Sequence, residues 1–156
     1  MAQQLWFLRH GEAEPHGATG DDDRALTERG REQSVSAGSA LASLEIVFQL
    51  VFTSPKVRAL ETAELACDHL GVEPIVHEPL REGFDADEAL ALLHAAGEDR
   101  RILVVGHEPD FSQVVHDLTG ARIDLKKGGV AGVRVGGASE LIALLRPREL
   151  DRLASG

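Results

Sequence analysis

Four basic side chains of this sequence are of the types that bind and attack a phosphoryl group. They are Arg9, His10, Arg58 and His107. The planar guanidinium of arginine donates paired hydrogen bonds that match the oxygens of phosphate. A neutral imidazole can act as a nucleophile, and a protonated one stabilises developing negative charge. Brought together by a fold, these side chains would predict phosphoryl-transfer chemistry.

The elements that must position them are short apolar runs, which predict strands. Four such runs occupy residues 5–8, 47–52, 74–77 and 102–105. Near-continuous apolar runs are typical of a parallel sheet that is covered on both faces. Two further runs, at residues 130–135 and 140–145, flank a Gly-Gly pair. This second pattern predicts a hairpin with a glycine-rich turn.

Helices are predicted between these strands. Thr27 is a suitable N-cap for a helix that runs to about residue 44. Ser54 is the predicted cap of the next helix, with Pro55 at its first position and Gly71 just past its end. Cys67 falls on the apolar face of that helix, so we expect it to be a small core residue.

Two more helices are predicted at residues 86–96 and 109–119. Alternating strands and helices predict an α/β fold, a three-layer sandwich with a mainly parallel central sheet. The sequence contains no internal repeat and no low-complexity linker. We therefore expect one domain over residues 1–156.

All four basic side chains lie just beyond predicted strands. In open α/β sheets, ligands bind outside the carboxyl ends of the strands. Taken alone, each residue has an ordinary explanation: a loop arginine, a solvated helix residue or a structural histidine. Their shared position favours one cationic pocket, to which helix N-termini would add backbone donors.

The composition limits the classes of partner. The chain has 156 residues and a net charge of −10, which opposes binding to nucleic acid or to an anionic membrane. It contains one cysteine, so neither an internal disulfide nor a multi-thiolate zinc site is expected. The N-terminus lacks a basic signal-peptide region, and no apolar stretch approaches the roughly 20 residues that span a bilayer. We expect a cytoplasmic protein.

Other phosphoryl-transfer chemistries fit the sequence poorly. A cysteine phosphatase needs an arginine six residues after its thiolate, where Cys67 is followed by Glu73. The sequence has no P-loop motif, and the His-Glu pair at His107 lacks a second histidine because position 111 is Phe. The run of three acids at Asp21 is expected to be a solvated loop rather than a metal site. The interpretation that remains is phosphoryl transfer through a histidine, without a metal or any other cofactor.

Three segments of the sequence resemble the signature segments of the histidine phosphatase superfamily, the phosphoglycerate mutase-like fold. The segments are Leu8-Arg9-His10-Gly11-Glu12, Thr53-Ser54-Pro55-x-x-Arg58-Ala59-x-x-Thr62-Ala63 and Val105-Gly106-His107-Glu108-Pro109. The resemblance extends over residues 5–120. It implies a phosphoglycerate mutase-like fold and a hydrolase that works through a histidine.

Within the superfamily, the sequence is most similar to the short bacterial phosphohistidine phosphatases. Their Asp-x-x-Arg-Pro-Leu-Thr segment corresponds to Asp21-Asp22-Asp23-Arg24-Ala25-Leu26-Thr27, which departs from it only at Ala25. Mutases instead carry an asparagine about five residues after the reactive histidine, near His16 of this chain. The resemblance therefore implies a phosphohistidine phosphatase that acts on a signalling or phosphotransfer protein.

The resemblance also implies roles for individual residues. His10 would be the nucleophile, and Arg9, Arg58 and, if it is protonated, His107 would hold the phosphoryl oxygens. Arg24 and Gly11 would contact the substrate.

The general acid is left open by the sequence. Glu82 is our first candidate for protonating the leaving group, with Glu78 and Asp85 as alternatives. A departing imidazole, with a pKa of about 6.5, needs such an acid less than an alkoxide does. An enzyme without any general acid is therefore also an open interpretation.

Two other functions also stay open. One is a phosphatase for small phosphomonoesters such as sugar phosphates, and the other is a non-catalytic phosphate-binding module. The expected partner is accordingly a phosphorylated protein or a small phosphoester, with neither nucleic acid nor a membrane.

Overall fold

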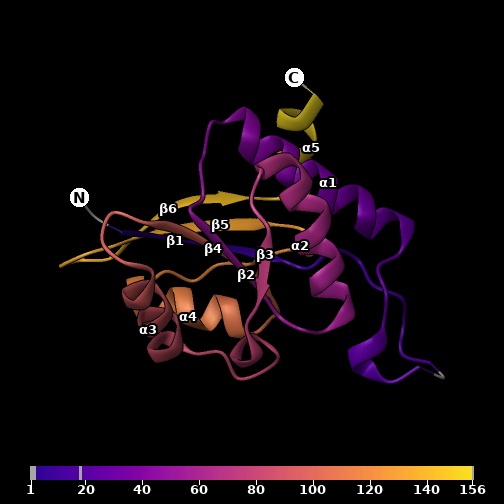
Figure 1. Cartoon of the computed structure of the whole chain (residues 1–156), viewed down its shortest axis with the longest axis horizontal. Helices are drawn as coiled ribbons and strands as arrows, with labels where there is room; N and C mark the ends of the chain where they lie inside the picture. Colours follow the sequence, from indigo (N-terminus) through magenta and orange to yellow (C-terminus); the bar gives the residue numbers. More distant parts are fainter. Residues whose placement is uncertain (1–2, 18, 156) are drawn as a thin grey trace.

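Six strands form one mixed sheet in the computed structural model, which describes residues 3–17 and 19–155 of the chain. The spatial order is β3-β2-β4-β1-β5-β6 (Figure 1). The strands are β1 (Gln3–Arg9), β2 (Leu50–Thr53), β3 (Pro74–Val76), β4 (Arg101–Gly106), β5 (Val130–Val135) and β6 (Glu140–Leu145). The first four run parallel, whereas β5 is antiparallel to β1 and pairs with β6 as a hairpin.

The apolar run of β1 is continuous because both faces of this central strand are buried. Leu5 and Phe7 pack into one core cluster, while Trp6 and Leu8 pack into the other. Alternate side chains of a strand point to opposite faces, so a strand covered on both sides must be apolar throughout. The predicted strand at residues 5–8 is confirmed for this reason.

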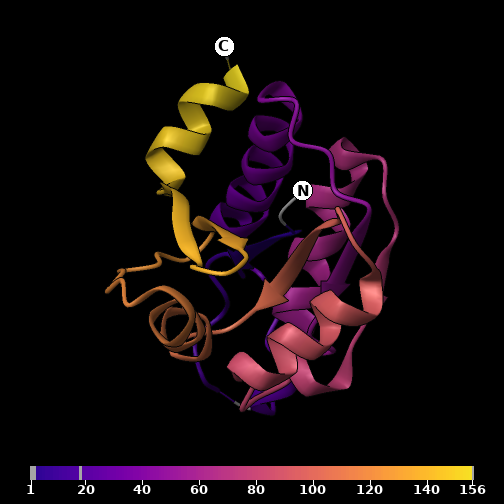
Figure 2. The same cartoon turned by 90° about the vertical axis from the view of Figure 1, so that its left-hand side faces the viewer.

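Helices cover the two faces of the sheet as separate layers. One layer contains α1 (Glu28–Ser43), α2 (Val57–Leu70) and α5 (Pro147–Ser155), and the other contains α3 (Ala86–Ala96) and α4 (Asp110–Thr119). Figure 2 shows the two layers on opposite sides of the strands. The predicted three-layer α/β sandwich with a mainly parallel sheet is thus confirmed. No helix within the described residues has the length and apolar character needed to cross a bilayer.

The predicted helix ends agree with the structure at Thr27 and Gly71. Thr27 Oγ1 accepts the backbone N–H of Gly30, and Gly71 adopts the left-handed conformation, with φ of 70°, at the end of α2. Cys67 lies on the buried face of α2 and is part of the core, as expected. Burial raises the pKa of its thiol to about 12, which keeps the thiol protonated.

Three expectations about the elements were wrong. The strand predicted from residue 47 begins at Leu50, and Val47 is 63% exposed. The helix predicted to start at Ser54 begins at Val57, because Ser54 Oγ accepts the N–H of Lys56 in a turn before the helix. The acidic run forms a short 3-10 helix, η1 (Asp21–Asp23), rather than a loop.

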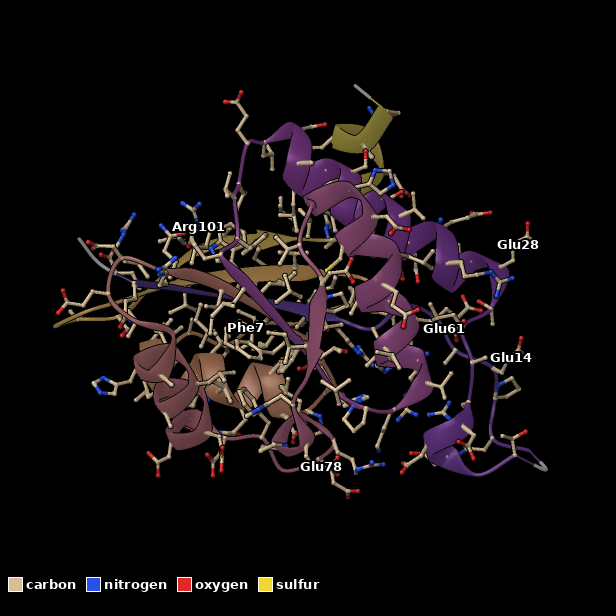
Figure 3. The ribbon with its side chains drawn as sticks, in the orientation of Figure 1. Phe7, Glu14, Glu28, Glu61, Glu78 and Arg101 are labelled. Atoms are coloured by element: carbon tan, nitrogen blue, oxygen red, sulfur yellow. The ribbon has the colours of Figure 1, made fainter. Side chains whose placement is uncertain are left out.

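The carboxyl ends of β1, β2 and β4 meet at one edge of the sheet. Arg9 pairs with Gly106 across β1 and β4, and Thr53 pairs with Val105 across β2 and β4. This edge lies on the right in Figure 1, beside η1, while Arg101 is labelled at the opposite edge in Figure 3. The three signature segments therefore converge where the sheet topology predicts a ligand site.

Candidate active site

His10 is the first residue after β1, and its backbone is held on two sides. Its N–H donates to the carbonyl of Gly106 at 3.0 Å, and its own carbonyl accepts the N–H of Gly128 at 3.0 Å. The ring Nδ1 lies 2.7 Å from the carbonyl oxygen of Gly11. A carbonyl can only accept, so the ring proton resides on Nδ1. Nε2 therefore carries the lone pair that a nucleophile needs.

The imidazole of His10 is neutral at physiological pH. Burial lowers its pKa to about 4, against the smaller opposing effect of the bond to Gly11. The positive charges of Arg58, Arg9 and Arg24 lower the pKa further. A neutral ring surrounded by cations combines an available lone pair with a field that attracts an anion.

His107 lies beside His10, with 5.3 Å between the ring centroids. Its Nε2 and the Oγ of Ser54 are hydrogen-bonded at 2.8 Å. Burial, followed by the proximity of His10 and Arg58, lowers the pKa of His107 to about 3. The condition attached to the predicted role of His107, that the ring is protonated, is therefore not met in the ligand-free protein. A bound phosphate dianion would oppose this shift, because a nearby negative charge favours the imidazolium.

The two arginines approach the same edge of the sheet from different elements. Arg9 ends β1 and donates from Nη1 to the carbonyl of Leu125 at 2.9 Å. Arg58 lies in the first turn of α2, is 5% exposed, and donates from Nη1 to the carbonyl of Asp21 at 2.8 Å. The guanidinium of Arg9 is thus anchored through one nitrogen, and that of Arg58 through two, since its Nη2 also donates to the Asp21 carboxylate at 3.3 Å.

Unpartnered nitrogen atoms collect at this site. Four buried side-chain nitrogens of the described residues have no hydrogen-bond partner, and three of them belong to predicted site residues. These are Nε of Arg9, Nε of Arg58 and Nδ1 of His107. Buried polar atoms are almost always paired, so a group of unpaired ones makes this edge of the sheet a candidate ligand site. The two guanidinium nitrogens are donors, which suit the oxygens of an anion.

Asp21 is a site residue that our reading of the sequence missed. Its carboxylate lies 3.2 Å from Nζ of Lys56, 3.3 Å from Nη2 of Arg58 and 3.0 Å from Nε of Arg24. Partial burial raises the pKa of Asp21, but the bond from Lys56 and the charge of Arg58 outweigh it. They hold the pKa well below its ordinary value. The expected solvated acidic loop is therefore wrong for this residue.

Lys56 was also missed, although its place two residues before Arg58 was a usable signal. Only 8% of Lys56 is exposed, and its ammonium contributes to lowering the pKa of His107. Arg24 lies close enough to lower the pKa of His10, and it donates from Nη1 to the carbonyl of Glu14. The site thus contains two cations in addition to Arg9 and Arg58.

Gly11 is explained by close packing. Its N–H donates to Thr62 Oγ1 at 3.1 Å, and a Cβ at this position would lie 2.5 Å from the carbonyl oxygen of Gly30. A Cβ on Gly30 would in turn lie 2.0 Å from the carbonyl oxygen of Glu12. The N-terminal turn of α1 is therefore packed closely against the segment that contains His10. The predicted contact of Gly11 with substrate stays a prediction, since its N–H is already used.

The sequence model of the histidine phosphatase superfamily (branch 1) matches residues 5–86. The chain belongs to this superfamily. A sequence relative, an uncharacterized protein of Picosynechococcus sp. strain PCC 7002, is 34% identical over 94% of this chain and 98% of its own. The two chains are thus similar over nearly their whole lengths.

Two other histidine phosphatase relatives bear on the chemistry. The protein histidine phosphatase SixA, in a structure with tungstate, superimposes with a TM-score of 0.85. It is 26% identical, and the match covers 94% of this chain and 99% of SixA. A 2,3-bisphosphoglycerate-dependent phosphoglycerate mutase of Streptococcus pyogenes is 41% identical over 71 residues. That match covers 44% of this chain and 31% of the mutase. The chain is therefore a phosphatase of this superfamily with the mutase-like fold.

The three candidate acids of this histidine phosphatase have different environments. Glu78 is exposed and accepts from Arg81 Nε at 2.6 Å, and it lies on the lower rim in Figure 3. Asp85 caps α3 by accepting the N–H of Glu88 at 2.9 Å. Glu82 is exposed, in the loop between the short 3-10 helix η2 (Glu78–Leu80) and α3.

The loop that carries Glu82 is attached to both sides of the site. Arg81 Nη1 donates to a carboxylate oxygen of Asp22, which adjoins Asp21. The N–H of Gly83 donates to Asp110 at 3.0 Å, three residues beyond His107. Of the three acids, Glu82 is the one whose neighbours on each side contact segments of the site.

Proposed function

We propose that this chain is a phosphohistidine phosphatase that removes the phosphoryl group from a histidine of another protein through phosphorylated His10. The observation that carries the proposal is the environment of His10. Its Nε2 lone pair is available, and each of its neighbours Arg9, Arg58 and His107 has one buried side-chain nitrogen without a hydrogen-bond partner. The overall likeness to a protein histidine phosphatase supports the same substrate class.

In the first step, Nε2 of His10 attacks phosphorus, and the bond from phosphorus to the leaving imidazole breaks. The guanidinium groups of Arg9 and Arg58 hold the equatorial oxygens, where negative charge is spread in the transition state. The departing imidazole takes a proton from solvent or from Glu82. In the second step, water attacks phosphorus, the bond to Nε2 breaks, and inorganic phosphate leaves.

His10 can serve in both steps without moving its ring. Its Nδ1–H bond to Gly11 can persist when Nε2 becomes phosphorylated, because the proton on Nδ1 does not take part. Splitting one displacement into two is the usual advantage of covalent catalysis. The site residues supply each of these steps without a metal, so we expect chelators to leave activity unchanged.

A rapid-quench experiment tests the proposal. A phosphohistidine protein labelled on phosphorus, mixed with enzyme in the presence of a chelator, should transfer label to the peptide that contains His10. The label should be acid-labile and base-stable. The His10→Asn variant should neither accept label nor turn over substrate. Label on a serine, or an active His10→Asn variant, would contradict the mechanism.

A phosphatase for small phosphomonoesters is the second candidate. The observation that favours it is the similarity of 71 residues to a phosphoglycerate mutase, an enzyme of small phosphoesters. Parallel assays with a phosphohistidine protein and a panel of sugar phosphates separate the two candidates. Higher kcat/KM on a sugar phosphate would favour the second.

A further inference from the structure

The cations of this acidic protein are unevenly distributed. Six of its 16 Lys and Arg residues line a single surface groove of about 550 Å³. No acidic side chain lines that groove. The six cations are Arg9, Arg29, Lys126, Lys127, Arg146 and Arg148. We refer to this feature as the cationic groove. A chain with a net charge of −10 repels anions over most of its surface, whereas the cationic groove would attract them.

Four segments far apart in the sequence build the cationic groove, the first of them the end of β1 with Arg9. Arg29 comes from the first turn of α1, the two lysines precede β5, and Arg146 and Arg148 surround the start of α5. Helices α1 and α5 pack against each other, as the upper part of Figure 2 shows. The groove is therefore a product of the tertiary fold and not of a basic run in the sequence.

The groove is directly connected to the candidate active site. Arg9 lines it and also lies close enough to His10 to lower the pKa of that imidazole. The turn that carries Lys126 is closed by the N–H of Gly129, which donates to the Lys126 carbonyl at 2.7 Å. In the same turn, the N–H of Gly128 donates to the carbonyls of Arg9 and His10. A ligand whose phosphoryl group reaches His10 would thus extend along these cations.

The exposure and the ion pairs of these cations indicate the kind of ligand that the groove would bind. The side chains of Arg29, Lys126, Arg146 and Arg148 are between 46% and 76% exposed. All four pair with acids that lie outside the groove lining: Arg29 with Asp151, Lys126 with Asp124, and both Arg146 and Arg148 with Glu149. Lys127 forms no ion pair with a described residue. Exposed, partly compensated cations suit steering and weak docking of a charged surface, more than tight enclosure of a small anion.

We propose that the cationic groove docks an acidic segment of the phosphoprotein substrate, next to its phosphohistidine. The proposal rests on the proposed function and names the partner chemistry at the same site. A polypeptide is favoured over nucleic acid because the rest of the acidic surface would repel an extended phosphate backbone. Docking of this kind raises the association rate and lowers KM, while the chemical step at His10 stays unchanged.

The test uses two synthetic phosphohistidine peptides of equal length, one with Glu residues beside the phosphohistidine and one with Gln in their place. Free phosphohistidine is the third substrate. We expect wild-type kcat/KM to be about tenfold higher on the Glu peptide, through KM, with the preference lost at high salt. The triple variant Lys126→Glu, Lys127→Glu, Arg148→Glu should lose the preference and keep its rate on free phosphohistidine. The control is Arg100→Glu, an exposed residue at the opposite edge of the sheet. It should keep the preference.

Binding of the unphosphorylated peptides, measured by fluorescence anisotropy, separates the two proposals. No turnover of any phosphohistidine substrate, with selective binding of the Glu peptide, would refute the proposed function and support the groove. Equal binding and turnover of both peptides by the wild type would overturn the groove proposal. Two other results would also overturn it. One is a triple variant that loses as much kcat/KM on free phosphohistidine as on the Glu peptide. The other is a single-stranded oligonucleotide of matched charge that binds more tightly than the Glu peptide.

Discussion

Nη2 of Arg58 lies 3.3 Å from the carboxylate of Asp21, and Nη1 of the same guanidinium donates to the Asp21 carbonyl. The carboxylate also pairs with Lys56 and Arg24. One anion of the protein thus compensates three cations at the place where we expect an anionic substrate. It orients the cations and competes with the ligand at the same time.

Replacing Asp21 by Asn should tighten inhibition by inorganic phosphate. Asparagine keeps the hydrogen bond from Arg58 to the backbone carbonyl of residue 21, but it removes a negative charge near the bound anion. An exposed ion pair contributes about 0.5–1 kcal/mol, so we expect the inhibition constant to fall about two- to fivefold. The matched control is Asp23→Asn, an exposed residue of the same short helix. Weaker inhibition in Asp21→Asn would instead show that orienting the cations outweighs the competition.

Replacing Arg58 by Lys should reduce kcat/KM by about 10²–10³, the effect of removing one donor from a transition-state oxyanion. An ammonium can still pair with Asp21, but it cannot donate to two phosphoryl oxygens through a fixed planar group. The exposed Arg100→Lys is the control for the change of residue type. Near wild-type activity in Arg58→Lys would place that side chain outside the site.

Stability should fall as the pH drops below about 6.5, the ordinary pKa of histidine. The pKa of His10 is lowered to about 4 in the folded protein, and that of His107 to about 3. Between these values and 6.5 the unfolded chain binds protons that the folded chain does not. Each such proton costs the folded state about 1.4 kcal/mol per pH unit. Thermal unfolding from pH 7 to 5 measures this slope, and His107→Gln should reduce it by about half. A Tm independent of pH over this range would contradict the buried neutral histidines.

Replacing Glu82 by Gln should distinguish the two candidate substrates. An imidazole leaves readily near neutral pH, so we expect less than about a tenfold fall in kcat on phosphohistidine. On an alkyl phosphate the loss should reach about 10²–10⁴, the usual contribution of a general acid. Glu78→Gln is the control, because Glu78 pairs with Arg81 at the surface. A fall of about 10³ on phosphohistidine would make Glu82 necessary for that substrate as well.

Much of the fold could be predicted from local patterns with a direct physical cause. The run at residues 5–8 predicted a strand because burial on both faces requires apolar residues throughout. Thr27 and Gly71 predicted helix ends through a side-chain cap and a left-handed residue. Ser54 misled the prediction, since its hydroxyl has the chemistry of a cap but closes a turn and contacts His107 instead.

Other features of the site could not be predicted, because they depend on contacts between distant residues. The charge state of His107 follows from its burial beside His10 and Arg58, which no local pattern encodes. Asp21 is separated by 37 positions from Arg58, so its pairing required the fold. Lys56 was easier to predict, because it lies within the second signature segment, two residues before Arg58.

The contact between Gly11 and Gly30 separates the residues around His10 that cannot be substituted without moving the backbone from those that can. An alanine at either position would place its methyl group within 2.5 Å of a backbone oxygen, so the loop or α1 would have to move. Selection for a new substrate can therefore change few residues beside His10. Glu82, Lys126 and Lys127 are exposed, and changes there meet no such barrier. Divergence in specificity among chains of this kind should accumulate in these outer loops while the glycine contact stays fixed.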